Sequence, residues 1–279
     1  MREFISAASE GIRIFRKNGS MTNAAAISFY AFFSLIPIMF LIIAGAGFVL
    51  GARPDLEERI IGMVRESLPY IGGGLVRDLR TLSENWQTFG WLGLLSLISG
   101  AELVLNAMVK ALTSIFDTEE RFGFFRTRLI GLVVIFLAIM SALASISVTA
   151  LFFFLDRFEI DLFGLGYVYG LLLILVFGYL APLMLISLVI AVVYRVLAGG
   201  NLDLRHAFFG SALFAILWEA AKQLFALYVS NFLSYNKFYG SLGTLMILLL
   251  WIFYTMNIFL FAASMARASY LRSKKGHAI

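Results

Sequence analysis

Six long apolar segments constrain the fold of this chain more than any other feature of its sequence. Each is at least as long as the roughly 20 residues that an α-helix needs to cross the hydrocarbon core of a bilayer. Hydrophobic residues make up 61% of the chain and charged residues 14%, whereas soluble domains are roughly 45–50% apolar and about 25% charged. The sequence therefore predicts an all-α integral membrane protein with six transmembrane helices. These are expected at residues 23–51, 88–115, 129–155, 165–194, 207–229 and 241–266.

An even number of spans places both termini on the same side of the membrane. Lys and Arg are enriched in the two termini and in the loops at 116–128 and 195–206. Because cytoplasmic loops carry the excess of positive charge, we expect both termini in the cytoplasm. The net charge of +5 suits membrane lipids as partners. The basic residues are spread over several short loops, which argues against nucleic acid as a partner.

Three segments flank or interrupt the predicted membrane domain at 23–268. Residues 1–22 contain an expected amphipathic helix at 4–17, which either lies in the membrane interface or packs on the cytoplasmic face of the protein. Residues 52–87 have the pattern of a short helical cap on the periplasmic side, and residues 269–279 form a basic cytoplasmic tail. The apolar face of the amphipathic helix carries Phe4, Ile5, Ala8, Ile12 and Phe15.

Two prolines and two glycines are candidate kinks or hinges. Pro37 and Pro182 lie inside predicted spans, where proline removes a backbone donor and bends the helix. For Pro37, a kink that serves packing is the first interpretation and a functional hinge the second. Gly240 and Gly243 lie where the short connection before the sixth span meets the start of that span.

Charged side chains inside two of the spans are the candidate functional residues. Glu102 and Lys110 lie in the second span, and Glu219 and Lys222 lie in the fifth. A charge at the centre of a membrane helix costs roughly 2.5–3.5 kcal/mol on insertion scales, so each should face a partner or a wet cavity. By depth, Glu102 could meet Lys222 and Lys110 could meet Glu219, while Glu219 and Lys222 could also pair along their own helix.

The charges have two interpretations: structural pairs that fix helix register, or a polar cavity for a charged or amphipathic substrate such as a lipid headgroup. Apolar residues would serve packing as well as paired charges do, which favours the cavity. The cavity-lining candidates are Glu102, Asn106, Lys110, Trp218, Glu219, Lys222 and Tyr239.

No arrangement typical of an enzyme is apparent. The chain has no cysteine, and its two histidines are His206 and His277. No group of residues has the spacing of metal ligands, so neither a metal nor another cofactor is expected.

Three motifs together resemble the YihY/BrkB family of bacterial inner-membrane proteins, once labelled ribonuclease BN. The first runs from Ala24-Ala25-Ala26-Ile27-Ser28-Phe29-Tyr30 through Ser34 and Pro37. The second comprises Gly210, Trp218-Glu219, Lys222 and Tyr228. The third is Tyr239-Gly240-Ser241-Leu242-Gly243 followed by Leu248-Leu249-Leu250-Trp251. The resemblance covers nearly the whole chain and implies a multi-pass protein of the bacterial inner (plasma) membrane.

The chain departs from this family at two places. It has Gly199-Gly200-Asn201 where family members usually carry a Pro-Asn turn, and Ala262-Ala263-Ser264 where they commonly carry Gly-Ala-Glu. A role for that glutamate therefore cannot be transferred. The leading hypothesis is a transporter or lipid-handling protein with a polar intramembrane cavity. The alternative is a non-transporting envelope scaffold or assembly factor with envelope protein partners. Ribonuclease activity is disfavoured, because RNA cleavage needs a cytosolic acid/base or metal site.

Overall fold

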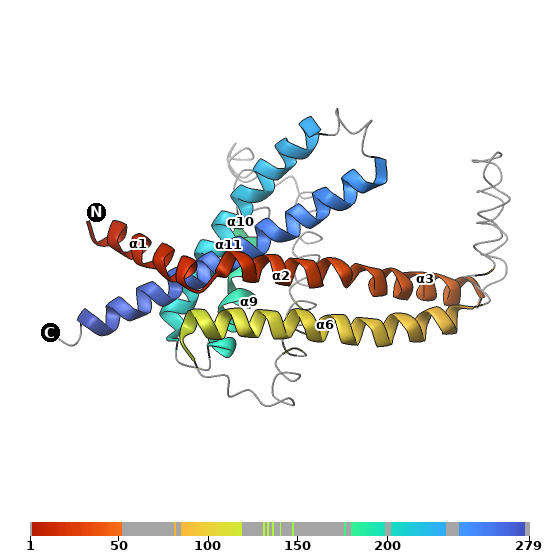
Figure 1. Ribbon diagram of the computed structural model, residues 1–279, viewed down its shortest axis with the longest axis horizontal. Helices are drawn as coiled ribbons and strands as arrows, with labels where there is room; N and C mark the ends of the chain where they lie inside the picture. The colour runs from red at the N-terminus through yellow and green to blue at the C-terminus, as the bar shows by residue number, and fades with distance from the viewer. Residues whose placement is uncertain are drawn as a thin grey trace, which may run out of the picture. The chain divides into compact units, whose positions relative to one another are not determined.

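The computed structural model describes the greater part of the chain. The residues described are 2–51, 81, 85–118, 131, 133, 136, 140, 147, 176, 180–198, 202–232 and 240–276. Seven helices fall within these ranges (Figure 1): α1 (Arg2–Lys17), α2 (Ser20–Phe33), α3 (Leu35–Gly51), α6 (Trp86–Phe116), α9 (Ala181–Leu197), α10 (Leu204–Phe232) and α11 (Gly240–Gly276).

The chain divides into two compact units. Unit 1 comprises Met1–Ser28 and Leu105–Ile279, and unit 2 comprises Phe29–Val104. The boundaries fall inside α2 and α6.

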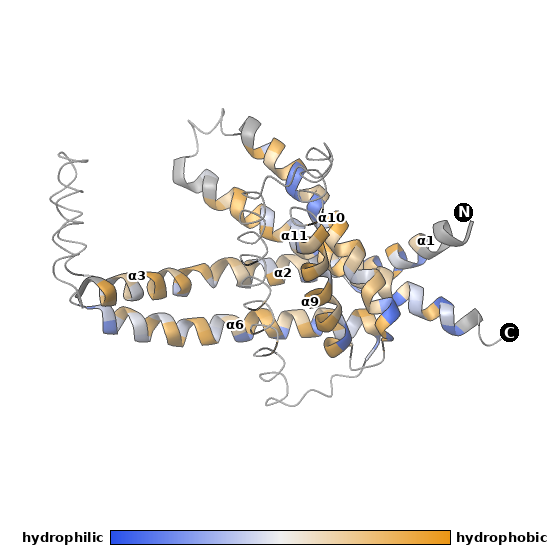
Figure 2. Ribbon diagram, turned by 180° about the vertical axis from the view of Figure 1, so that it is seen from behind, coloured by the Kyte–Doolittle hydropathy of each residue, from blue (hydrophilic) through white to orange (hydrophobic). Residues whose placement is uncertain are grey.

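Four helical stretches of the described chain are long and apolar enough to cross a membrane: Ser20–Val49, Trp86–Phe116, Leu204–Val229 and Leu245–Lys274. They coincide with the predicted first, second, fifth and sixth spans, which confirms a helical membrane protein. The predicted fourth span overlaps α9 in its second half. Most of the predicted third span and of the cap at 52–87 lies outside the described residues. Hydrophobic residues dominate these helices (Figure 2), and many of their large apolar side chains are exposed, as expected where lipid is the solvent.

Unit 2 is built on an antiparallel pair formed by α3 and α6. Phe48 contacts Trp86 with ring centroids 5.0 Å apart, and Phe40 contacts Phe89 at 6.1 Å. Small residues on α6 allow this approach: a Cβ added to Gly93 would lie 3.1 Å from the Leu41 backbone nitrogen. Close approach through glycine is typical of helix packing in membranes, where apolar burial alone drives no association.

The first predicted span is interrupted at Ser34, between α2 and α3. Pro37 follows three residues later, and a proline ring clashes with the carbonyl four residues before it, here that of Phe33. The Ser34 hydroxyl donates to the Tyr30 carbonyl at 2.8 Å, a local bond that competes with the helical ladder and often bends membrane helices. Together these residues explain why the apolar run forms two helices instead of one.

The core of unit 1 is centred on Tyr194 of α9. Its side chain is 0% exposed, and its hydroxyl donates to the Phe259 carbonyl of α11 at 2.6 Å. Its ring also contacts those of Phe116 and Phe259, with centroids 6.3 and 5.1 Å away. Between α9 and α10, the hydroxyls of Ser187 and Ser211 lie 3.0 Å apart and are buried. Burying a polar group without a partner is costly, so these bonds fix how the three helices meet.

Gly210 lies at a close approach of α10 to α11. A Cβ at this position would lie 2.7 Å from the Ala266 Cβ and 3.1 Å from the Ala262 carbonyl oxygen. Ala262, Ala263 and Ser264 are all fully buried, and the Ser264 hydroxyl donates to the Leu260 carbonyl of its own helix. The departure from the Gly-Ala-Glu pattern therefore lies in a close helix contact, and the serine is satisfied locally.

Helix α1 packs on α11. Phe15 meets Phe261 edge to face at 5.9 Å, and Gly11 lies against the thioether of Met265. The structure packs this helix against the protein, and its location at the membrane interface stays a prediction. The packed face overlaps the predicted one only in part: Phe15 contacts α11, whereas Ile12 is 45% exposed and Ile14 is buried in its place. Contact with α11 therefore selects the stripe that contains Gly11, Ile14 and Phe15.

Helix α11 is 37 residues long and continues through the predicted tail to Gly276. Lys and Arg are good helix formers, and positive charge near a helix C-terminus is favourable. The basic residues after Arg267 therefore extend the helix.

Candidate functional site

The charged pair of the fifth span lies in the middle of α10. The Lys222 Nζ is 2.6 Å from the Glu219 Oε2, one helical turn away. The same ammonium lies over the Trp218 ring, 4.6 Å from its centroid. The Gln223 amide approaches the Glu219 Oε1 at 3.5 Å. The expected pairing along the helix therefore forms, and a cation–π contact supports the lysine.

An aromatic groove lies next to the charged pair on α10 and begins at Ala221. It has a volume of about 400 Å³ and lies between α10 and α11. Phe225 and Trp251 meet across it with ring centroids 4.6 Å apart, and Tyr228 lies beside Phe225 at 6.2 Å. The lining residues are Ala221, Leu224, Phe225, Tyr228, Leu250, Trp251 and Tyr254.

The charged pair lies where the packed core of unit 1 ends. In α10, the buried side chains stop at Phe214 and Ala215, and in α11 they start again at Phe259. Trp218 stacks on Phe214, with ring centroids 6.4 Å apart, and so links the core to the charged pair. The side chains of Lys222 and Glu219 are 39% and 26% exposed. Beyond them α10 and α11 enclose the groove, so charged and apolar surfaces follow each other along a single helix.

The groove differs in character from the expected cavity. Charged residues were expected to line a polar cavity, whereas the residues that line this groove are apolar and aromatic. Phe225, Leu250, Trp251 and Tyr254 were not among the predicted site residues. Trp218, Phe225 and Tyr228 recur at a spacing that keeps them on the same side of α10, and this spacing is the signal that could have identified the groove.

The three predicted residues of the second span lie along one side of α6. Glu102 is half-buried, whereas Asn106 and Lys110 are exposed. Within the described part of unit 1, no ion pair joins Lys110 to Glu219, whose carboxylate is engaged by Lys222. Glu102 belongs to unit 2 and Lys222 to unit 1, so their contact stays a prediction.

The remaining predicted residues lie at helix ends or beyond them. Pro182 is in the first turn of α9, after a π-helical residue at Leu180; proline is tolerated there because the N–H groups of a first turn lack helical partners. Gly240 begins α11 and Gly243 is buried within it. Tyr239 lies outside the described residues. Among the residues described, no three His, Cys, Asp or Glu side chains gather as a metal site would require.

Comparison with known proteins identifies the family. The sequence profile described as virulence factor BrkB matches residues 12–278. The chain belongs to the virulence factor BrkB family. This confirms the resemblance drawn from the three motifs, and in unit 1 those motifs supply Gly210 at the helix crossing and Trp218, Glu219 and Lys222 beside the groove.

Relatives within the BrkB family are described as membrane proteins. A UPF0761 membrane protein of Azotobacter vinelandii is 29% identical over 247 residues, which are 87% of this chain and 58% of the relative. Another, from Alkalilimnicola ehrlichii, is 27% identical over 258 residues, or 91% of this chain and 56% of the relative. This chain thus spans less than three-fifths of the length of these two proteins.

A relative of similar length comes from Bacillus subtilis. It is named a putative ribonuclease-like protein, YfkH, and is 23% identical over 256 residues, which are 91% of both chains. No solved structure matches this chain.

Proposed function

We propose that this chain handles an amphipathic lipid in the bacterial inner membrane. The polar end of the lipid engages the Glu219–Lys222 pair, and a hydrocarbon chain occupies the aromatic groove at Phe225 and Trp251. Both termini then face the cytoplasm, with the basic, packed end of unit 1 on that side, in keeping with the positive-inside rule.

The observation that carries this proposal is the position of the charged pair directly beside the groove. Lys222 and Phe225 are three residues apart on one helix, so a headgroup at the first places its chain at the second. Binding sites for small molecules combine a mainly apolar, aromatic lining with a few polar groups that fix orientation. A groove of about 400 Å³ lies within the size range of such sites.

The name of the Bacillus subtilis relative raises RNA cleavage as another activity. We propose that this chain is not an enzyme of that kind. RNA cleavage requires a water-accessible acid/base or metal site, and the charged pair lies within a stretch of membrane-spanning length. The membrane protein names of the other relatives agree with a role in the bilayer.

The proposal is tested by the lipid content of the gently purified protein, measured by native mass spectrometry. The variants are Glu219→Gln/Lys222→Met for the pair and Trp251→Ala for the groove. Trp91→Ala is the matched control, because Trp91 of α6 is 67% exposed and does not line the groove. We expect a specific lipid on the wild type and on the control, and its loss from both site variants at matched thermal stability.

Identical lipids on all four proteins, or none on any, would overturn the proposal. The scaffold hypothesis would then be preferred, with the charges acting as structural pairs. Cross-linking in cells would be expected to capture an envelope protein in stoichiometric amount.

A further inference from the structure

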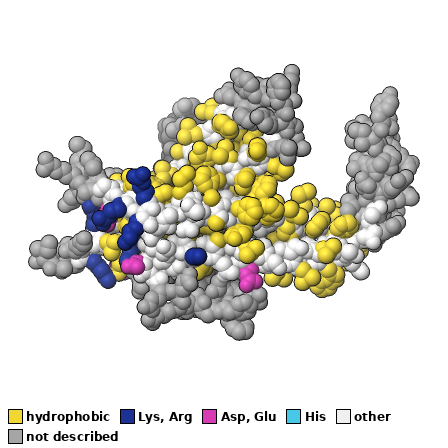
Figure 3. Space-filling model, in the orientation of Figure 1, with side chains coloured by type: hydrophobic (Ala, Val, Ile, Leu, Met, Phe, Trp, Pro, Cys, Tyr) yellow, Lys and Arg dark blue, Asp and Glu magenta, His cyan; other side chains and the backbone are white. Residues whose placement is uncertain are grey.

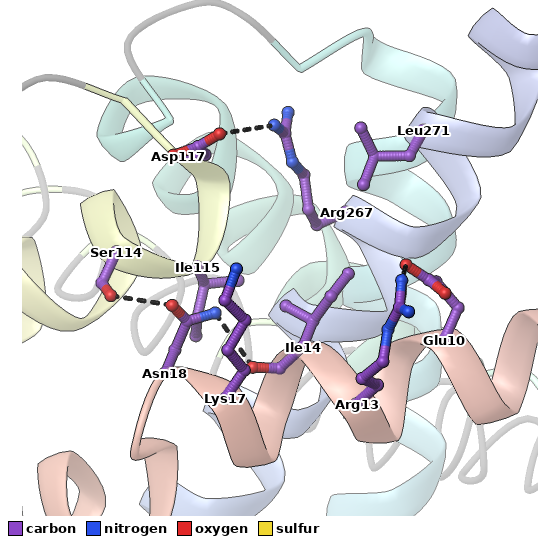
Figure 4. Close-up of a pocket in the computed structure, with 10 residues that line it drawn as sticks. All are labelled: Glu10, Arg13, Ile14, Lys17, Asn18, Ser114, Ile115, Asp117, Arg267 and Leu271. Carbon is purple, nitrogen blue, oxygen red and sulfur yellow. Dashed lines mark hydrogen bonds and ion pairs between the residues drawn. The ribbon is translucent and has the colours of Figure 1, made fainter.

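A second cavity lies at the opposite end of unit 1 from the groove. It has a volume of about 400 Å³ and lies between α1, the C-terminal end of α6 and the C-terminal part of α11. Figure 3 shows Lys and Arg side chains gathered over α1 and this part of α11. The lining residues are Glu10, Arg13, Ile14, Lys17, Asn18, Ser114, Ile115, Asp117, Arg267 and Leu271 (Figure 4).

Two of the three cations in this pocket keep donors available to a ligand. Arg13 is bound to Glu10 on its own helix. Lys17 extends into the pocket and makes no ion pair with any residue of the described chain. Arg267 is only 14% exposed, and its Nη2 lies 3.8 Å from the Oδ2 of Asp117, which is 91% exposed. That distance is too long for a hydrogen bond, so the guanidinium still has donors to offer.

The floor of the pocket is held in shape by bonds between its elements. The Ser114 hydroxyl of α6 donates to the Asn18 Oδ1 at 3.0 Å, and the Asn18 amide donates to the Ile14 carbonyl at 2.9 Å. Asp117, with a φ of +54°, turns the chain sharply out of α6. The Thr118 N–H then bonds back to the Thr113 carbonyl at 3.0 Å, as in a Schellman motif. These bonds hold the end of α6 against Asn18 at the pocket.

The lining also combines positive charge with apolar surface. Ile14, Ile115 and Leu271 lie beside Lys17 and Arg267. A soluble anion needs only the cations, whereas a phospholipid at the membrane edge presents a phosphate together with its glycerol and upper acyl chain. Basic pockets between membrane helices on the cytoplasmic side suit such headgroups, and arginine binds phosphate through paired, charge-assisted hydrogen bonds.

We propose that this pocket binds a phosphate group through Lys17 and Arg267, and that the phosphate belongs to a phospholipid headgroup. The site is separate from the groove between α10 and α11. It neither requires nor excludes lipid handling there.

The test uses the full chain in detergent, with phosphatidylglycerol and inorganic phosphate as probes. Lys17→Gln/Arg267→Gln removes the two cations proposed to bind the phosphate and leaves Arg13, which is paired with Glu10. Arg16→Gln/Lys274→Gln is the matched control: it removes the same net charge from two exposed residues outside the pocket lining. Lys17→Arg/Arg267→Lys keeps both charges and tests whether the helices still pack. Binding is measured by native mass spectrometry, and each protein is checked for thermal stability.

We expect one saturable phosphatidylglycerol per wild-type chain. Affinity should fall about tenfold or more in the pocket variant, because two charge-assisted bonds are lost. It should change less than about twofold in the control, because the control loses the same net charge but no direct contact with the phosphate. Long-range attraction falls equally in the two variants, so the difference between them reports the direct contacts. The charge-keeping variant should bind more tightly than the pocket variant, although a lysine at position 267 cannot make the paired hydrogen bonds of arginine. Glu219→Gln/Lys222→Met should keep this lipid, which separates the site from the groove.

Two results would overturn the proposal. Equal affinity in the pocket variant and the control would mean that the cations serve only the folded structure. Saturation of the pocket by inorganic phosphate, with no further gain from the lipid, would assign the site to a soluble phosphate compound. A pocket variant that fails to fold leaves the charge-keeping variant to decide, and loss of binding there at normal stability would also refute the proposal.

Discussion

Replacing Gly210 with alanine tests how closely α10 and α11 must approach. The new Cβ would lie 2.7 Å from the Ala266 Cβ and 3.1 Å from the Ala262 carbonyl oxygen. Carbon atoms pack at about 3.5–4.0 Å, so the helices would have to separate locally by roughly 1 Å. Neither obstacle can rotate away, because one is a methyl group on Cα and the other is backbone.

The expected cost follows from two opposing terms. Overpacking a tight contact costs about 1–3 kcal/mol, whereas alanine in place of glycine favours a helix by up to about 1 kcal/mol. We therefore expect Gly210→Ala to destabilise the protein by about 1–2 kcal/mol. That corresponds to a fall in Tm of about 2–8 °C, at the 2–4 °C per kcal/mol typical of larger domains.

The assay is thermal unfolding followed by tryptophan fluorescence in one detergent. Gly45→Ala in α3 is the matched control, because nothing lies within 4 Å of the added Cβ, and its Tm should stay the same or rise. Ala266→Gly removes the opposing methyl and should recover part of the Tm lost by Gly210→Ala when the two are combined. A Tm for Gly210→Ala at or above that of Gly45→Ala would refute this account of the crossing.

Two further substitutions test the core and the charged pair. Tyr194→Phe deletes a buried hydroxyl that donates at 2.6 Å to the Phe259 carbonyl. The substitution should lower the free energy of unfolding by about 1 kcal/mol, which the same thermal assay would detect as a lower Tm. An unchanged Tm would mean that ring packing alone holds this helix. Neutralising Glu219 or Lys222 singly leaves an unpaired charge that costs roughly 2.5–3.5 kcal/mol at a membrane centre. Each single variant should therefore have a lower Tm than the double variant Glu219→Gln/Lys222→Met, whereas equal Tm values in all three would mean that the two charges do not stabilise each other.

The sequence was most informative about features that depend on residues close to one another along the chain. Hydropathy located the membrane-length helices, because an apolar run of that length reports directly on the bilayer. The Glu219–Lys222 pair could be anticipated because residues three apart meet on any helix. Pro37 indicated a bend in the first span, although the break itself falls at Ser34.

Contacts between helices could not be inferred in the same way. The groove exists because Phe225 of α10 meets Trp251 of α11, and one sequence does not reveal which faces of two helices oppose each other. The same limit applies to Ile14, which is buried in preference to Ile12 because α11 covers it. The basic pocket also depends on three elements distant in sequence, with Asn18 and Ser114 joined across them.

The length of α11 has a consequence for how the groove responds to its surroundings. From Gly240 to Ala266 the helix carries no charge, and 27 residues at 1.5 Å each span about 40 Å, against a hydrocarbon core of about 30 Å. A helix longer than the bilayer accommodates the excess mainly by tilting, and a thinner membrane demands more tilt. Close contact at Gly210 fixes α11 against α10 at one end. When α11 changes its tilt, it therefore rotates about this contact, and the separation of the two helices changes most at the far end, between Phe225 and Trp251. The width of the groove should therefore follow bilayer thickness, which makes acyl-chain length in the host membrane a control on what the groove admits.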